Sequence, residues 1–231
     1  MRLLLHGLQA SGASVTAAWL AQRPGCIALI DVPFSHITPF VAGNRPIVAK
    51  AVITTAYAIT EHQERFEADK TVLIVRNPVA NWLSLSRKGY RDDNGLMEEK
   101  FVLADAALAR VGKDYDLLIR YEDLEHKRED VRRALATLGW PLPPQADAFR
   151  KDQAAILSDL FAHAPGAAAR FPHGFGDWRE GGFRFGPNPE AAADVIATVS
   201  TLCPRLMALY AEANNTGRPK LTSLPGRCSS V

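Results

Sequence analysis

The chain has 231 residues, of which 47% are hydrophobic, and its formal net charge is +2. This length and apolar content suffice for one sizeable core and argue against two large domains. The near-neutral charge, with no long basic stripe, argues against nucleic acid or an anionic membrane as the partner.

Cysteine usage and hydropathy bear on the compartment. Cys26, Cys203 and Cys228 are few, odd in number and without metal-ligand spacing, which fits a reducing compartment. The apolar start at Met1–Leu5 is too short for a secretory signal, and no apolar run reaches transmembrane length. We therefore expect a cytoplasmic protein with no membrane span. Its oligomeric state stays open.

Short apolar runs alternate with helical patterns along the chain. Strands are predicted over 3–6, 26–30, 47–53, 71–75 and 116–120, and helices over 14–22, 57–66, 78–87, 98–111 and 128–138. This alternation predicts a three-layer α/β/α fold with a central, mostly parallel sheet. We expect a single domain over 1–213, mainly helical after Asp147, and a flexible C-terminal tail over 214–231.

A Gly- and Ser-rich turn joins the first strand to the first helix. Its candidate cofactor-binding residues are Gly7, Gln9, Ala10, Ser11, Gly12, Ala13 and Ser14. Glycine lets the backbone bend so that N–H groups and the helix N-terminus converge on an anion. The glycine spacing is that of a P-loop, but Ala13 replaces the lysine that reaches the β and γ phosphates of a triphosphate. The turn suits a nucleotide with one 5′-phosphate, or it joins strand to helix without binding any ligand.

A second signature follows the fourth strand, where Arg76-Asn77-Pro78 precedes Ser84. The strand delivers Arg76 to the carboxyl edge of the sheet, where open α/β folds bind ligands. An Arg fork with a hydroxyl suits a terminal phosphate. The alternative is an Arg76–carboxylate pair, with Ser84 facing solvent.

These motifs, in this order, resemble those of the PAPS-dependent sulfotransferase family, whose fold is P-loop-like; PAPS is 3′-phosphoadenosine 5′-phosphosulfate. The resemblance covers roughly residues 2 to 185. It rests on the two signatures above and on three later segments, which are Tyr121-Glu122-Asp123-Leu124, Leu138-Gly139-Trp140-Pro141 and Gly176-Asp177-Trp178-Arg179.

The resemblance implies an enzyme that moves a sulfuryl group from PAPS to a hydroxyl or amine of a carbohydrate or other small molecule. The product nucleotide is 3′-phosphoadenosine 5′-phosphate (PAP). The first turn would then hold the 5′-phosphosulfate, and Arg76 with Ser84 the 3′-phosphate. Tyr121 would contact the adenine and Trp178 would act as a lid or stacking residue, although either aromatic equally suits core packing.

Two departures from the family pattern are evident. Ala10 stands where the family has a basic residue, and the family's Arg-Lys-Gly before Gly-Asp-Trp is absent. Arg170 is a candidate replacement for the missing Arg-Lys-Gly segment; the alternative is a plain surface arginine. Lys50 matches a strand-borne lysine of the family and is the candidate cation in place of the basic residue that Ala10 replaces; the alternative is a lysine that extends from a strand into solvent.

Sulfuryl transfer in line through a loose transition state needs positioning and positive donors, and we expect no metal to be required. The candidate general bases are Asp31 and His36, which follow the second strand. The alternatives are that Asp31 is a structural cap and that His36 is an exposed loop residue.

Rival functions are a P-loop-type small-molecule kinase, which Ala13 opposes, and a non-catalytic nucleotide-binding protein. The acceptor itself is not identified; loops over 34–45, 90–97 and 157–175 are expected to shape its pocket.

Overall fold

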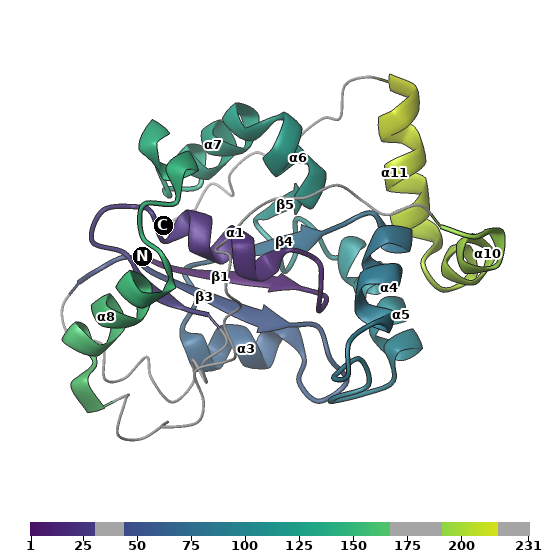
Figure 1. The fold of residues 1–231 in the computed structure, drawn as a ribbon, viewed down its shortest axis with the longest axis horizontal. Coiled ribbons are helices and arrows are strands. Elements are labelled where there is room, and N and C mark those ends of the chain that lie inside the picture. Colours follow the sequence, from purple (N-terminus) through teal and green to yellow (C-terminus); the bar gives the residue numbers. More distant parts are fainter. Residues whose placement is uncertain (31–43, 167–190, 217–231) are drawn as a thin grey trace, which may run out of the picture.

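A computed structural model describes residues 1–30, 44–166 and 191–216. Within them, five strands form one parallel sheet (Figure 1). The strands are β1 (Arg2–Gly7), β2 (Ile27–Leu29), β3 (Ile47–Val52), β4 (Lys70–Val75) and β5 (Leu117–Arg120). Their spatial order is β2-β3-β1-β4-β5, and each neighbouring pair is parallel. The predicted parallel sheet is confirmed.

Helices cover both faces of this sheet, as the α/β/α prediction requires (Figure 1). On one face lie α1 (Ala13–Leu20), α6 (Tyr121–His126) and α7 (Arg128–Thr137). The other face is covered by α3 (Ile59–Phe66), α4 (Pro78–Ser86), α5 (Met97–Leu108), α10 (Ala193–Leu202) and α11 (Pro204–Thr216). The 3₁₀ helix η2 (Pro144–Ala148) and α8 (Gln153–His163) complete the described elements, with α8 beside β2.

Strand β1 shows why the sheet is buried on both sides. Successive side chains of a strand point to opposite faces, and here Leu3 and Leu5 pack with α1 whereas Leu4 packs with the α3 and α5 side. All three leucines are fully buried. A continuous apolar run, rather than an alternating one, is the pattern expected of a strand in the middle of a parallel sheet.

The carboxyl end of β1 is where the chain changes direction across the sheet. β1 leads into α1 on one face, while its neighbours β3 and β4 lead into α3 and α4 on the other face. Open α/β sheets bind their ligands at such a switch point. The fold therefore places the crevice beside Gly7, which ends β1.

Two details differ from the sequence prediction. The short helix α6 begins directly after β5, with Glu122 and Asp123 in its first turn, where carboxylates interact favourably with the helix dipole. Helical periodicity cannot reveal an element this short. The sequence predicts a tail from Asn214, whereas α11 continues to Thr216. Among the described residues, no helix is both long and apolar enough to cross a membrane.

Candidate functional site: a cationic crevice at the end of β1

The turn after β1 has a backbone that only particular residues allow. A Cβ on Gly7 would lie 2.7 Å from the Ile74 carbonyl oxygen of β4, so a larger residue would push the two strands apart. Gly12 has a φ of 87° and caps the N-terminus of α1. Ala10 also has a positive φ of 62°, which is uncommon for a residue with a side chain. The turn thus curves tightly and leads its backbone N–H groups into the start of α1.

The segment after β4 positions Arg76 in the same crevice. The side chain of Asn77 accepts hydrogen bonds from Val79 N at 3.1 Å and Ala80 N at 3.2 Å, so it caps α4, and Pro78 occupies the first turn. Arg76 Nη1 donates to the Ala10 carbonyl at 3.2 Å, which links the two signatures directly.

The Tyr-Glu-Asp motif at the start of α6 braces both segments. The Tyr121 ring lies where a Cβ on Gly12 would be, 2.2 Å from that position at its Cδ2 atom, and the Arg76 guanidinium carbon lies 4.9 Å from the ring centroid. Glu122 accepts a hydrogen bond from Asn77 N at 2.9 Å. Asp123 forms a two-bonded pair with Arg120 at 2.7 and 2.8 Å. The motif therefore fixes the turn and Arg76 relative to each other.

Helix α11 reaches the same brace. Tyr210 donates its hydroxyl proton to Glu122 at 2.7 Å, and burial, followed by the charge of Glu122, raises the pKa of that phenol well above its usual value. Tyr210 therefore stays protonated as the donor. A carboxylate held from both sides in this way is a fixed part of the site.

A buried lysine on α5 holds the other side of the turn. Lys100 is fully buried, and its ammonium donates to Gln9 Oε1 at 3.0 Å, to the Arg91 carbonyl at 2.8 Å and to the Asp93 carbonyl at 2.5 Å. Burial lowers the pKa of Lys100, while the charges of Asp92 and Asp93 oppose that change. Asn81 of α4 adds a 2.7 Å hydrogen bond to the Gln9 carbonyl. The turn is thus held in shape by groups that need not touch any ligand.

Between these parts lies a cavity of about 290 Å³. Among the residues that the structure describes, its lining includes three cationic side chains, Lys50, Arg76 and Lys88, and no carboxylate. Lys50 Nζ donates to Ser14 Oγ at 3.0 Å, so this cation sits beside the start of α1. Because helix N-termini and cations both favour anions, the cavity is suited to a ligand with negative charge along much of its length.

The structure brings most of the residues singled out in the sequence to this cavity. The lining includes Gly7, Gln9, Ala10, Gly12, Ala13, Ser14, Lys50, Arg76, Ser84 and Tyr121. Ser11 differs, because its side chain is 1% exposed, is absent from the lining, and its hydroxyl has no hydrogen-bond partner among the described residues. Asp31, His36, Arg170 and Trp178 lie outside the described residues.

Sequence reasoning did not single out Lys88, Lys100 or Asn81, and it named Glu122 only as part of the Tyr-Glu-Asp-Leu segment. Lys88 follows Ser84 by four residues but lies beyond the end of α4 at Ser86, so helical spacing does not explain why both residues line the cavity. Lys100 lies 91 positions from Gln9, and no local pattern connects them. Tyr90, expected near the acceptor, also lines the cavity.

The fold and crevice define an α/β protein with a cationic crevice, suited to an anionic ligand, at the end of its first strand. No protein-family model matches the chain, and no curated protein matches its sequence. Solved structures do match. The mouse sulfotransferase SULT7A1, in complex with PAP, aligns over 93% of this chain and 84% of its own, with 16% identity and a TM-score of 0.54.

The sulfotransferase domain of the Synechococcus PCC 7002 olefin synthase aligns over 87% of this chain and 94% of its own, with 16% identity and a TM-score of 0.44. The likeness to the mouse structure shows that this chain has the sulfotransferase fold, which confirms the fold prediction.

Proposed function

We propose that the chain is a sulfotransferase that moves a sulfuryl group from PAPS to a hydroxyl or amine of a small-molecule or carbohydrate acceptor and releases PAP. The observation that carries this proposal is the cavity after β1, where a glycine turn, a helix N-terminus and three cations converge. PAPS carries negative charge at both ends, and the cavity offers cationic groups along its lining. The mouse sulfotransferase of the same fold was crystallised with PAP.

Each end of the nucleotide has its own set of groups in this proposal. The turn from Gly7 to Ser14 receives the 5′-phosphosulfate through backbone N–H groups and the start of α1. Arg76 and Ser84 receive the 3′-phosphate, and Lys88 adds a cation to the same region of the lining. Tyr121, which lies between Gly12 and Arg76, is the proposed contact to the adenine.

Lys50 supplies the cation that Ala10 does not. As the acceptor oxygen bonds to sulfur, the bond from sulfur to the bridging phosphate oxygen breaks, and negative charge moves onto the leaving PAP. A donor fixed near that oxygen lowers the barrier. The hydrogen bond from Lys50 to Ser14 supports this role, because the ammonium then lies beside the start of α1, which is the proposed 5′ end of the crevice. No metal enters the proposed reaction.

The acceptor must also lose a proton, and Asp31 and His36 remain the proposed bases. Asp31→Asn and His36→Ala are expected to slow turnover while leaving PAP affinity largely intact. Full activity in both variants would assign the base to another residue. Arg170 and Trp178 remain proposed contacts that complete the site, and the proposed compartment is the cytoplasm.

Calorimetric titration with PAP tests the proposal. Arg76→Ala removes a charged fork, and the loss of about two charge-assisted hydrogen bonds corresponds to roughly a hundredfold weaker affinity. Arg133→Ala is the matched control, because Arg133 is an exposed arginine of α7 that pairs with Asp130. Transfer of ³⁵S from labelled PAPS to an acceptor in a cell extract would establish the reaction. Binding of ATP with Mg²⁺, but not PAP, would refute the proposal in favour of a kinase.

A further inference from the structure

Recognition of a 3′-phosphate requires that the guanidinium of Arg76 is directed at the phosphate and held there. A functional side chain is positioned only as well as the groups that support it. Arg76 and Asn77 lie between β4 and α4 and belong to neither element. Because neither regular element includes them, other groups must fix the peptide unit that joins these two residues.

Helix α6 fixes this peptide unit. Glu122 Oε1 accepts a hydrogen bond from Asn77 N, the nitrogen of the peptide unit, at 2.9 Å. The preceding residue of α6, Tyr121, places its ring beside the Arg76 guanidinium, whose central carbon lies 4.9 Å from the ring centroid. One short helix therefore holds Arg76 at both its backbone and its charged end. A rotation of the Glu122 side chain would release the first of these two contacts.

The Glu122 side chain in turn needs support to keep its geometry. A glutamate loses much rotamer freedom when it is held in one conformation, so a contact through one oxygen alone holds it weakly. Its second oxygen, Oε2, accepts a hydrogen bond from the Tyr210 hydroxyl at 2.7 Å. This short distance is typical of a hydroxyl that donates to an ionised carboxylate, which is a strong hydrogen bond. Tyr210 thus stabilises the rotamer in which the first oxygen faces Asn77.

Tyr210 is itself held in place by its surroundings. It is 9% exposed and packs in the core on the α3 and α5 side of the sheet. The first turn of α11 is attached to α5, because Leu206 N donates to the buried carboxylate of Asp105 at 2.8 Å. The guanidinium carbon of Arg120, which ends β5, lies 5.8 Å from the Tyr210 ring centroid. Among the described residues that line the cationic crevice, Tyr210 is absent, so any effect it has on a nucleotide there passes through Glu122.

We propose that Tyr210 is a positioning residue for recognition of the nucleotide's 3′-phosphate. Its hydroxyl fixes the Glu122 carboxylate, and that carboxylate fixes the backbone from which the Arg76 guanidinium reaches the phosphate. Helix α11 thereby sets how strongly the site prefers a nucleotide with a 3′-phosphate to one without it. The inference rests on the proposed function, because it needs Arg76 to receive that phosphate.

Calorimetric titration of the full chain with PAP and with adenosine 5′-phosphate (AMP), which lacks the 3′-phosphate, tests this role. The unmodified chain should bind PAP about a hundredfold more tightly than AMP, the value of two charge-assisted hydrogen bonds. Tyr210→Phe keeps the ring and removes only the hydroxyl. We expect it to lower this preference by about fivefold, which is part of the value of one hydrogen bond to a charged group. The loss should fall on PAP and leave the affinity for AMP unchanged.

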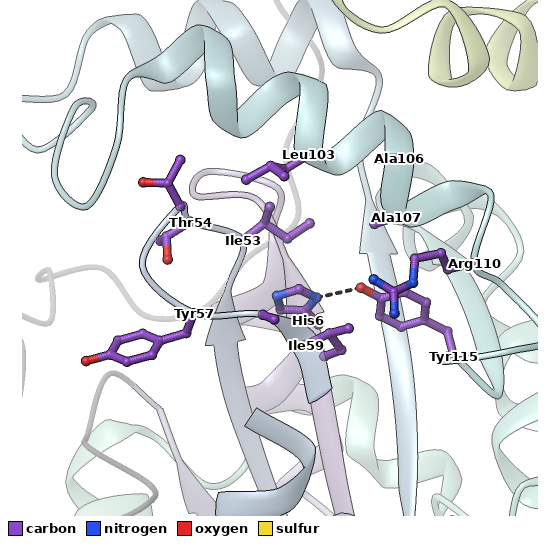
Figure 2. A pocket seen from close by; sticks show the side chains of 12 residues that line it. His6, Ile53, Thr54, Tyr57, Ile59, Leu103, Ala106, Ala107, Arg110 and Tyr115 are labelled. Carbon is purple, nitrogen blue, oxygen red and sulfur yellow. Dashed lines mark hydrogen bonds between the residues drawn. The ribbon is translucent and has the colours of Figure 1, made fainter. Parts of the chain in front are cut away.

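Tyr115→Phe is the matched control, because it also removes one buried hydroxyl. Tyr115 is 2% exposed, and its hydroxyl is hydrogen-bonded to His6 Nδ1 at 2.8 Å, as Figure 2 shows. Both residues line a second cavity, of about 340 Å³, on the α3 and α5 side of the sheet, and among the described residues its lining shares no member with that of the crevice. His6 adjoins Gly7, which belongs to the turn proposed to receive the 5′-phosphate, and PAP and AMP both carry that phosphate. The control should therefore leave the ratio of the two affinities unchanged.

A double-mutant cycle tests whether the effect passes through Glu122. Glu122→Ala removes the group through which Tyr210 acts, so adding Tyr210→Phe to it should lower the preference for PAP no further. An unchanged preference in Tyr210→Phe, the same fall in Tyr115→Phe, or an equal fall with and without Glu122 overturns the inference while the proposed function stands. Equal binding of PAP and AMP by the unmodified chain, or no binding of PAP, contradicts the proposed nucleotide contacts and the inference with them.

Discussion

Lys100→Met tests whether the nucleotide turn depends on a buried charge behind it. Methionine is an unbranched side chain that can fill the lysine's path, so the change removes the ammonium with little loss of packing. Three acceptors then lose their donor: Gln9 Oε1, the Arg91 carbonyl and the Asp93 carbonyl.

The size of the effect follows from two opposing contributions. Hydrogen bonds to a charged group stabilise by about 1.5–3 kcal/mol each, so three such bonds contribute roughly 4 to 9 kcal/mol. The cost of keeping an ammonium away from water offsets several kcal/mol of this. A net loss of about 3 kcal/mol remains, which for a domain of this length lowers the Tm by roughly 6–12 °C.

Thermal unfolding and PAP titration measure the two consequences separately. Release of Gln9 should weaken PAP binding by about tenfold, measured below the Tm of the variant. Lys113→Met is the control, since Lys113 is exposed and should change neither quantity. If Lys100→Met shifts the Tm by less than ~2 °C, well below the worked value, and leaves PAP affinity unchanged, Lys100 does not support the turn and the reasoning is refuted.

Three further results are expected. Gly12→Ala combines a positive φ with a collision against Tyr121, so calorimetry should show PAP affinity reduced more than tenfold; an unchanged affinity would mean that the turn does not bind the nucleotide. Lys50→Met should lower turnover by about a hundredfold and PAP affinity by less than tenfold, and equal losses in both would assign Lys50 to binding alone. Because the pKa of His6 is about 3 in the folded chain and near 6.5 unfolded, the unfolded state binds more protons between these values, and stability falls as pH drops through that window. His6→Leu should therefore flatten the slope of Tm against pH from about 6.5 to 4, and an unaltered slope would contradict a neutral, buried His6.

The sheet was predictable from sequence because its strands are short, apolar runs of residues. Leu3, Leu4 and Leu5 form a run too short for a helix of normal length, and the glycine at position 7 ends it. Such local signals also predicted that Arg76 and the first turn would share one edge, since parallel strands end on the same side.

Support for the site was not predictable in the same way. The contacts of Lys100 with Gln9 and of Glu122 with Asn77 join residues 91 and 45 positions apart. Each side chain taken alone fits a solvated helix face, and only packing of the helices on the sheet brings the partners together. The same holds for His6, which the sequence presents as the polar end of a strand and the structure places in a second cavity.

The close approach of the Tyr121 ring to Gly12 makes two distant positions depend on each other. Because the ring occupies the volume that a methyl group at residue 12 would need, a relative that keeps an aromatic residue at 121 must keep glycine at 12. A relative with a small residue at 121 has room for alanine or serine there, within the limits of its backbone. Paired changes at these sites, rather than similarity over the whole chain, are therefore a means of finding distant relatives of this protein.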